Sequence, residues 1–71
     1  MKYAVIIEEG ETSFGAHVPD LPGCGAVGET KEEVLELIQE AIEFHIEGLR
    51  EDGQPIPHPS SSIEYVDVRA A

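Results

Sequence analysis

The stretch Thr30–Glu51, TKEEVLELIQEAIEFHIEGLRE, decides the fold because it predicts a single long amphipathic helix. Thr30 is a typical N-cap, and Glu33 three residues later completes a capping box. No proline occurs from Thr30 until Pro55, and Asp52-Gly53 provides a stop signal. We therefore expect a helix that begins at Thr30 and ends near Gly53.

Apolar residues cover about half of the circumference of this helix, which is wider than a minimal core-facing stripe. The apolar side consists of Val34, Leu35, Leu37, Ile38, Ala41, Ile42, Phe44, Ile46 and Leu49. The opposite side carries Glu32, Glu33, Glu36, Glu40, Glu43, Glu47 and Glu51. One small sheet would leave part of so wide an apolar surface wet, so we expect a homodimer or a higher homo-oligomer.

The polar side of the helix contains like-charge pairs four residues apart, such as Glu36 with Glu40 and Glu43 with Glu47. Each such pair costs a few tenths of a kcal/mol, so a helix adapted only for stability would include lysines. The whole chain has 15 acidic and 4 basic residues and a formal charge of −11, which opposes binding to nucleic acid or to an anionic membrane. Two interpretations stay open: a solvated face, or a face that binds a cationic protein.

The residues around the helix predict a small antiparallel sheet. Alternating apolar residues indicate strands at 3–7 and 14–18, and Pro19-Asp20-Leu21-Pro22-Gly23 must leave the sheet because proline cannot donate a ladder hydrogen bond. We expect further strands at 24–28 and 63–68, with a proline-rich return at 54–62. The fold class is α+β, in the order β-β-β-α-β, with one long helix packed on the sheet.

The glycines at 23–28 match the spacing G-x-G-x-x-G of a dinucleotide-binding loop, but their context does not fit. Such a loop directly follows a buried strand and opens a helix in a parallel βαβ unit. Here two prolines separate the glycines from the strand that ends at Val18, and the negative charge opposes a pyrophosphate. The glycines are better explained by tight turns and close strand packing.

The histidines and the single cysteine have no spacing typical of a metal or catalytic site. His17, His45 and His58 lie in different elements, and Cys24 has no neighbouring Cys or His. We expect no catalytic residue, metal or cofactor. One cysteine suits a reducing compartment, and no apolar run approaches the roughly 18 residues of a membrane span, so we expect a cytoplasmic protein.

Four stretches resemble the HicB-like antitoxin family, also described as the UPF0150 type. The matching stretches are Tyr3-Ala4-Val5, Val18-Pro19-Asp20-Leu21-Pro22-Gly23-Cys24, Gly28-Glu29-Thr30-Lys31-Glu32-Glu33 and Gly53-Gln54-Pro55-Ile56-Pro57-His58-Pro59. Their order and spacing cover nearly the whole chain. Within this pattern Pro19, Pro22 and Gly23 shape the crossing, and Thr30 starts the helix.

The resemblance implies a partial ribonuclease-H-like fold without catalytic function, which neutralises a small, basic, mRNA-cleaving HicA toxin. The acidity of the chain agrees with such a partner. We expect the toxin to meet an acidic face and apolar contacts supplied by Leu21 or Phe44. The residues expected to bind the partner are Asp20, Leu21, Glu36, Glu40, Glu43 and Glu47.

Full-length relatives commonly add a C-terminal DNA-binding domain, whereas residues 1–71 are expected to form a single HicB-like domain without one. We therefore do not expect residues 1–71 to bind operator DNA as such full-length relatives do. Two alternatives remain: a small divalent-metal nuclease on the ribonuclease-H-like frame, and an orphan oligomeric domain that binds another protein or a small ligand. The nuclease would depend on Glu8, Glu64 and Asp67, with helix glutamates supplying the rest.

Overall fold

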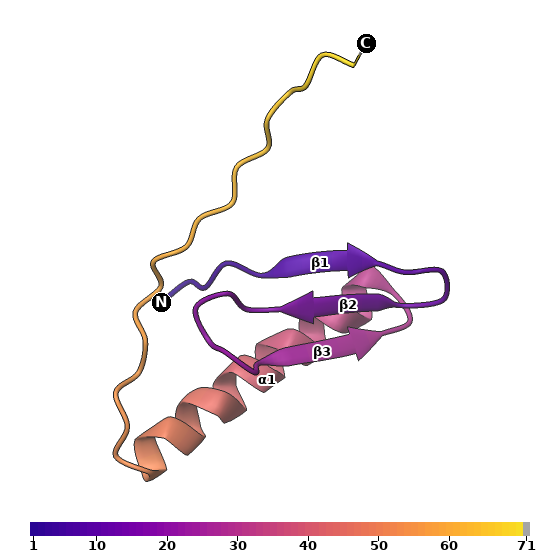
Figure 1. The fold of residues 1–71 in the computed structure, drawn as a ribbon. Coiled ribbons are helices and arrows are strands. Elements are labelled where there is room, and N and C mark those ends of the chain that lie inside the picture. Colours follow the sequence, from indigo (N-terminus) through magenta and orange to yellow (C-terminus); the bar gives the residue numbers. More distant parts are fainter. Residues whose placement is uncertain (71) are drawn as a thin grey trace.

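A computed structural model describes residues 1–70 and has three antiparallel strands followed by one long helix (Figure 1). The elements are β1 (Ile6–Glu9), β2 (Phe14–His17), β3 (Gly25–Gly28) and α1 (Lys31–Glu51). The strands lie in the order β1-β2-β3, and α1 packs across one face of the sheet, mainly against β3 and β2. The predicted α+β class with one helix on a small antiparallel sheet is confirmed.

The hairpin of β1 and β2 follows the alternation in the sequence. Ile6 pairs with His17 and Glu9 with Phe14, and the amide of Gly10 donates to the Ser13 carbonyl over 2.8 Å in the connecting turn. The first strand was expected at 3–7, whereas β1 begins at Ile6 and ends at Glu9. Successive strand side chains point to opposite faces, and every second residue of the expected segment packs on the core. The half-buried residues on that face are Tyr3, Val5, Ile7 and Phe14.

Both ends of α1 are capped by the residues that predicted them. The Thr30 Oγ1 accepts from the Glu33 amide over 3.0 Å, and Glu33 Oε1 accepts from the Glu29 amide over 3.0 Å. At the other end Gly53 has a φ of 68°, and the amide of Gln54 donates to the Leu49 carbonyl over 2.8 Å. The left-handed conformation of Gly53 and the hydrogen bond from Gln54 to Leu49, which closes a turn of six residues, form a Schellman motif that ends the helix.

The core lies between the helix and the sheet. Its buried residues are Ala16, Val18, Leu21, Cys24, Val34 and Ile38. Gly28 brings β3 close to the first turn of α1, because a Cβ there would lie 2.9 Å from the Val34 amide nitrogen. Side chains at this position would push the helix away from the sheet.

The loop between β2 and β3 is a compact turn that inserts one side chain into the core. The Leu21 amide donates to the Val18 carbonyl over 3.1 Å, and the Cys24 amide donates to the Leu21 carbonyl over 3.0 Å. Gly23 has a φ of 84°, a conformation that favours glycine. These bonds turn Leu21 inward, where it is fully buried.

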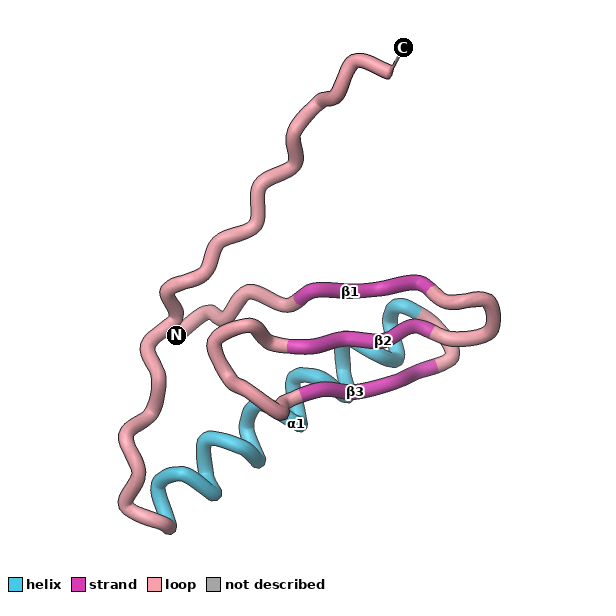
Figure 2. The backbone as a smooth tube through the Cα atoms, in the orientation of Figure 1, coloured by secondary structure: helices cyan, strands magenta, loops and turns pink. Residues whose placement is uncertain are grey.

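The predicted last strand at 63–68 is wrong. The chain after Gly53 is an extended tail that passes the N-terminus and projects from the body (Figure 2). Within residues 1–70, no ladder joins this tail to the sheet. The β-branched and aromatic residues of 63–68 favour a strand, but a strand also needs a neighbour with which to form hydrogen bonds.

Candidate protein-binding surface

Four glutamates form a continuous stripe on the outer side of α1. Glu36, Glu40, Glu43 and Glu47 follow each other at intervals of four, three and four residues, so they lie within an arc of about 60°. All four are exposed, on the side of the helix opposite the core residues Val34 and Ile38. We call them the acidic stripe. The helical periodicity placed this stripe correctly, whereas its role in binding stays a prediction.

A shallow apolar groove flanks the acidic stripe on the side of β3. Phe44 stands at its edge and is 71% exposed, although it is one of the largest apolar side chains in the protein. The groove has a volume of about 430 Å³ and continues across the loop that precedes β3. Its lining consists of Gly23, Cys24, Gly25, Ala41, Phe44, His45, Gly48, Leu49 and Asp52. We call it the Phe44 groove.

A second groove flanks the acidic stripe on the side of the N-terminal segment. It has a volume of about 480 Å³, and Glu43 of the acidic stripe stands on its rim. Its lining consists of Met1, Tyr3, Val5, Leu35, Ile38, Gln39, Ile42, Glu43 and Ile46. The acidic stripe is thus bordered by apolar surface on both sides, so a partner that covers the stripe and one groove would meet both charged and apolar groups, as partners do in protein interfaces.

The two expected binding residues of the β2–β3 loop have different environments. Leu21 is fully buried, so its side chain is not available to a partner in this conformation. Asp20 is half-buried and binds the tail of its own chain. Its Oδ2 accepts from the amides of Ser60 and Ser61, both over 2.9 Å, and its Oδ1 accepts from their hydroxyls over 3.1 and 2.8 Å respectively. We call this arrangement the Asp20 clamp.

The sequence did not predict the Asp20 clamp, because Ser60 and Ser61 lie 40 and 41 residues from Asp20 along the chain. The pKa of Asp20 is lowered to about 2. The main cause is the hydrogen bond from the Ser61 amide, and the bonds from the Ser61 hydroxyl and from Ser60 add to it. A second contact nearby holds the same segment, because the Tyr3 hydroxyl donates to the Pro57 carbonyl over 2.6 Å. The root of the tail is therefore fixed to the body at two points.

We expect the Asp20 clamp to survive mild acid. Because the folded-state pKa lies below the ordinary value of 3.8, ionised Asp20 stabilises the clamp above about pH 4, and this contribution is lost as the pH falls through about 2. A ¹³C titration of the side-chain carboxyl groups by NMR measures this pKa directly.

The matched variant for this titration is Ser60→Ala combined with Ser61→Ala, which removes the two hydroxyl donors and keeps the two amides. Its Asp20 pKa should lie between that of the wild type and 3.8. A wild-type Asp20 that titrates at 3.8 would show that the clamp does not form in solution.

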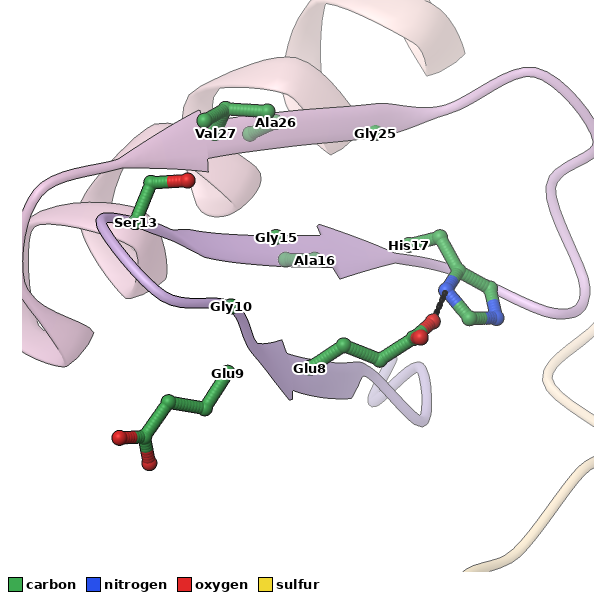
Figure 3. Close-up of a pocket in the computed structure, with 10 residues that line it drawn as sticks. All are labelled: Glu8, Glu9, Gly10, Ser13, Gly15, Ala16, His17, Gly25, Ala26 and Val27. Atoms are coloured by element: carbon green, nitrogen blue, oxygen red, sulfur yellow. Dashed lines mark ion pairs between the residues drawn. The ribbon is translucent and has the colours of Figure 1, made fainter.

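The face of the sheet opposite α1 is open and hollowed (Figure 3). Gly15 lies in the middle of this hollow, and a Cβ there would have no heavy atom within 4 Å. Nδ1 of His17 and Oε1 of Glu8 approach to 3.6 Å across β1 and β2, and both side chains are more than half exposed. An antiparallel sheet commonly has one solvated face, which accounts for this surface without a ligand.

The carboxylates of the nuclease alternative lie on separate segments. Glu8 is in β1, whereas Glu64 and Asp67 are in the projecting tail. Across residues 1–70, no group of three or more His, Cys, Asp or Glu side chains is arranged to hold a metal ion. Cys24 is buried, and this burial raises the pKa of its thiol, which lowers the fraction of reactive thiolate.

Comparison with known proteins matches residues 3–70 to the family described as the HicB-like antitoxin of bacterial toxin–antitoxin systems. The chain belongs to the HicB-like antitoxin family. The resemblance inferred from the proline loop and the helix start is thereby confirmed. None of the solved structures matches the chain significantly.

Relatives of this HicB-like chain include proteins of its own length and proteins of about twice its length. A UPF0150 protein of Thermoplasma acidophilum, Ta0767, is 44% identical over 71 residues, covering 99% of this chain and 100% of the relative. Antitoxin HicB 2 of Photorhabdus laumondii subsp. laumondii is 36% identical over 72 residues, covering 100% of this chain and 52% of that protein. An uncharacterized 14.9 kDa protein of Haemophilus phage HP1 is 37% identical over 67 residues, covering 94% of this chain and 50% of that protein. The HicB-like chain thus spans about half of the last two.

The helix of this HicB-like chain is amphipathic and not a membrane span. Among the residues that the structure describes, no helix is both long enough and apolar enough to cross a bilayer. The helix α1 has the length but is too polar.

Proposed function

We propose that this HicB-like chain is an antitoxin that binds and neutralises a small, basic, mRNA-cleaving toxin of the HicA type in the cytoplasm. Membership of the antitoxin family carries the proposal, since it implies a toxin partner. The acidic stripe supports a basic partner, because a surface that binds RNA must itself be positively charged. In this role the chain masks the toxin and performs no chemistry.

The acidic stripe and the Phe44 groove would act in sequence during binding. The net charge of −11 attracts a basic protein over a distance, and the stripe orients it as it approaches. Phe44 is 71% exposed in the free chain, and aromatic side chains that become desolvated often dominate the energy of an interface. Electrostatics would therefore set the rate of association, and burial of Phe44 would slow dissociation.

Self-association is a separate part of the proposal. Exposed apolar side chains remain on α1 after it has packed on the sheet, including Leu35 at 44% and Phe44 at 71%. A chain of 71 residues buries a smaller fraction of its surface than a larger domain does, so a second copy would add materially to its stability. We propose that the free protein is at least a dimer.

Inhibition of RNA cleavage tests the antitoxin proposal. A HicA-type toxin encoded beside this chain should cleave RNA when it is alone and lose that activity when an equal amount of the chain is added. An unrelated basic ribonuclease should keep its activity, which separates specific masking from simple charge attraction. Full toxin activity at a tenfold excess of the chain would overturn the proposal.

The same assay without toxin addresses the nuclease alternative. The chain alone, with Mg²⁺ or Mn²⁺, is expected to leave RNA and DNA intact. Cleavage that disappears when Glu64 and Asp67 are both changed to alanine would favour a nuclease instead.

A further inference from the structure

The tail of the chain contains an unpaired segment with the composition of a strand. Ile63–Val68, IEYVDV, is extended, and its apolar residues are exposed by 40% for Ile63, 94% for Tyr65, 78% for Val66 and 83% for Val68. Within residues 1–70, no backbone hydrogen bond joins this segment to the sheet. An extended, exposed and apolar segment with unpaired backbone groups can pair with the edge of a sheet.

The sheet has an unpaired edge that could accept such a strand. β1 is the outermost strand and pairs only with β2 among the described residues. A groove of about 400 Å³ runs beside it, and we call this the β1-edge groove. Its lining consists of Val5, Ile6, Ile7, Glu9, Phe14 and Lys31, together with Ile63 and Tyr65 of the tail. Backbone donors and acceptors of β1 thus lie next to a groove that has both apolar and charged lining residues.

The root of the tail is held so that the segment beyond it leaves its own body. The Asp20 clamp fixes Ser60 and Ser61, and the chain after them diverges from β1 (Figure 1). The radius of gyration is 14.1 Å, whereas a compact chain of this length has about 11 Å. Ile63 and Tyr65 border the β1-edge groove without filling it, since Tyr65 is 94% exposed.

We propose that Ile63–Val68 of one copy adds to β1 of a second copy as a fourth strand, and that the second copy returns its own tail in the same way. This inference rests on the proposed self-association and assigns it to the tail and β1, whereas the exposed apolar side chains of α1 are left to other contacts. Six extended residues span about 20 Å, and so does the edge formed by β1 and the residues just before it. The exchange is reciprocal, which gives a closed two-fold dimer and leaves no tail unpaired.

Two chains that each carry a charge of −11 repel one another, so hydrogen bonding and apolar burial must drive this exchange. Added salt should therefore strengthen the dimer by screening the repulsion. This dependence is opposite to that expected for the toxin complex, in which salt screens an attraction. The two kinds of association can thus be separated by ionic strength alone.

The test compares Val66→Pro with Ala70→Pro in the full chain. Proline at position 66 distorts the middle of the added strand, because its φ is fixed near −65° whereas an antiparallel strand has about −140°, and proline at position 70 lies beyond that strand. Light scattering should give twice the 7.7 kDa of one chain for the wild type and for Ala70→Pro. For Val66→Pro we expect the dimer dissociation constant to rise by about 100-fold.

Amide hydrogen exchange of residues 63–68 locates the pairing. Protection that appears as the wild-type protein concentration rises, and that Val66→Pro abolishes, supports the exchange. A wild-type monomer with protection at every concentration would mean that the tail pairs with its own β1, which overturns both the exchange and the self-association. A dimer that Val66→Pro leaves intact overturns the exchange alone, because the copies then meet elsewhere.

Discussion

A chain with lysine in place of Glu36, Glu40, Glu43 and Glu47 is expected to associate with its basic toxin about 10- to 100-fold more slowly at low salt. The four changes move the formal charge from −11 to −3 and reverse the sign of the acidic stripe. Electrostatic steering changes association rates by about 10- to 1,000-fold, and it weakens as salt screens the charges. Stopped-flow mixing at several ionic strengths measures this rate.

The fold should tolerate the reversal of the acidic stripe. All four side chains are exposed, lysine and glutamate have similar helix propensities, and like charges remain four residues apart after the change. The helix content measured by circular dichroism should therefore be unchanged. The difference in rate between variant and wild type should shrink as salt is raised to about 0.5 M.

A matched control carries lysine at Glu9, Glu11, Glu29 and Glu51, which changes the net charge equally but leaves the acidic stripe intact. This control should slow association less than the stripe variant does. Equal effects of the two variants would mean that the overall field attracts the toxin and that the stripe is no specific site. A stripe variant that binds at the wild-type rate would leave the stripe as a solvated surface.

Replacing Leu21 with alanine is expected to destabilise the protein by about 2–5 kcal/mol. Leu21 is 0% exposed, and truncation of a fully buried leucine leaves a cavity between the loop and the helix. Small domains have unfolding free energies of about 5–15 kcal/mol, so this loss would bring a thin core close to unfolding. Urea denaturation followed by circular dichroism measures the change.

The control for Leu21 is Leu37→Ala, the same substitution at a helix residue that is 36% exposed. Its cost should stay below about 1 kcal/mol, because surface substitutions have small effects. If Leu21→Ala does not fold, Leu21→Met keeps the volume and should cost less than about 1.5 kcal/mol. A Leu21→Ala chain as stable as the wild type would show that the loop does not pack on the core. Leu21 would then again be a candidate for contact with the toxin.

Much of the fold could be predicted because its hydrogen bonds are local. The N-cap joins Thr30 to Glu33 and Glu29, and the Schellman motif at Gly53 spans six residues, so both ends of α1 are visible in a short window of sequence. The first hairpin has a four-residue turn, and its alternation gives the core-facing side directly. Helical periodicity likewise placed the acidic stripe, since a stripe needs only a regular helix.

The tail shows the limit of this kind of prediction. Ile63–Val68 has the composition of a strand, but β propensity reflects packing on neighbours, and the sequence does not say which neighbour is within reach. The Asp20 clamp joins residues 40 positions apart and carries the tail away from β1. No local pattern of residues distinguishes a carboxylate that binds distant serines of its own chain, as Asp20 does, from one that is free to bind another protein.

The amino-acid sequence by itself determined the antitoxin family, the capped helix, the hairpin and the acidic stripe. Only the tertiary structure decided that Leu21 belongs to the core, that Asp20 holds the tail, and that 63–68 is not a strand of its own sheet. The physical reason is the separation along the chain of the groups involved. Contacts within a few residues follow from local geometry, whereas burial and long-range hydrogen bonds depend on how the completed elements pack together.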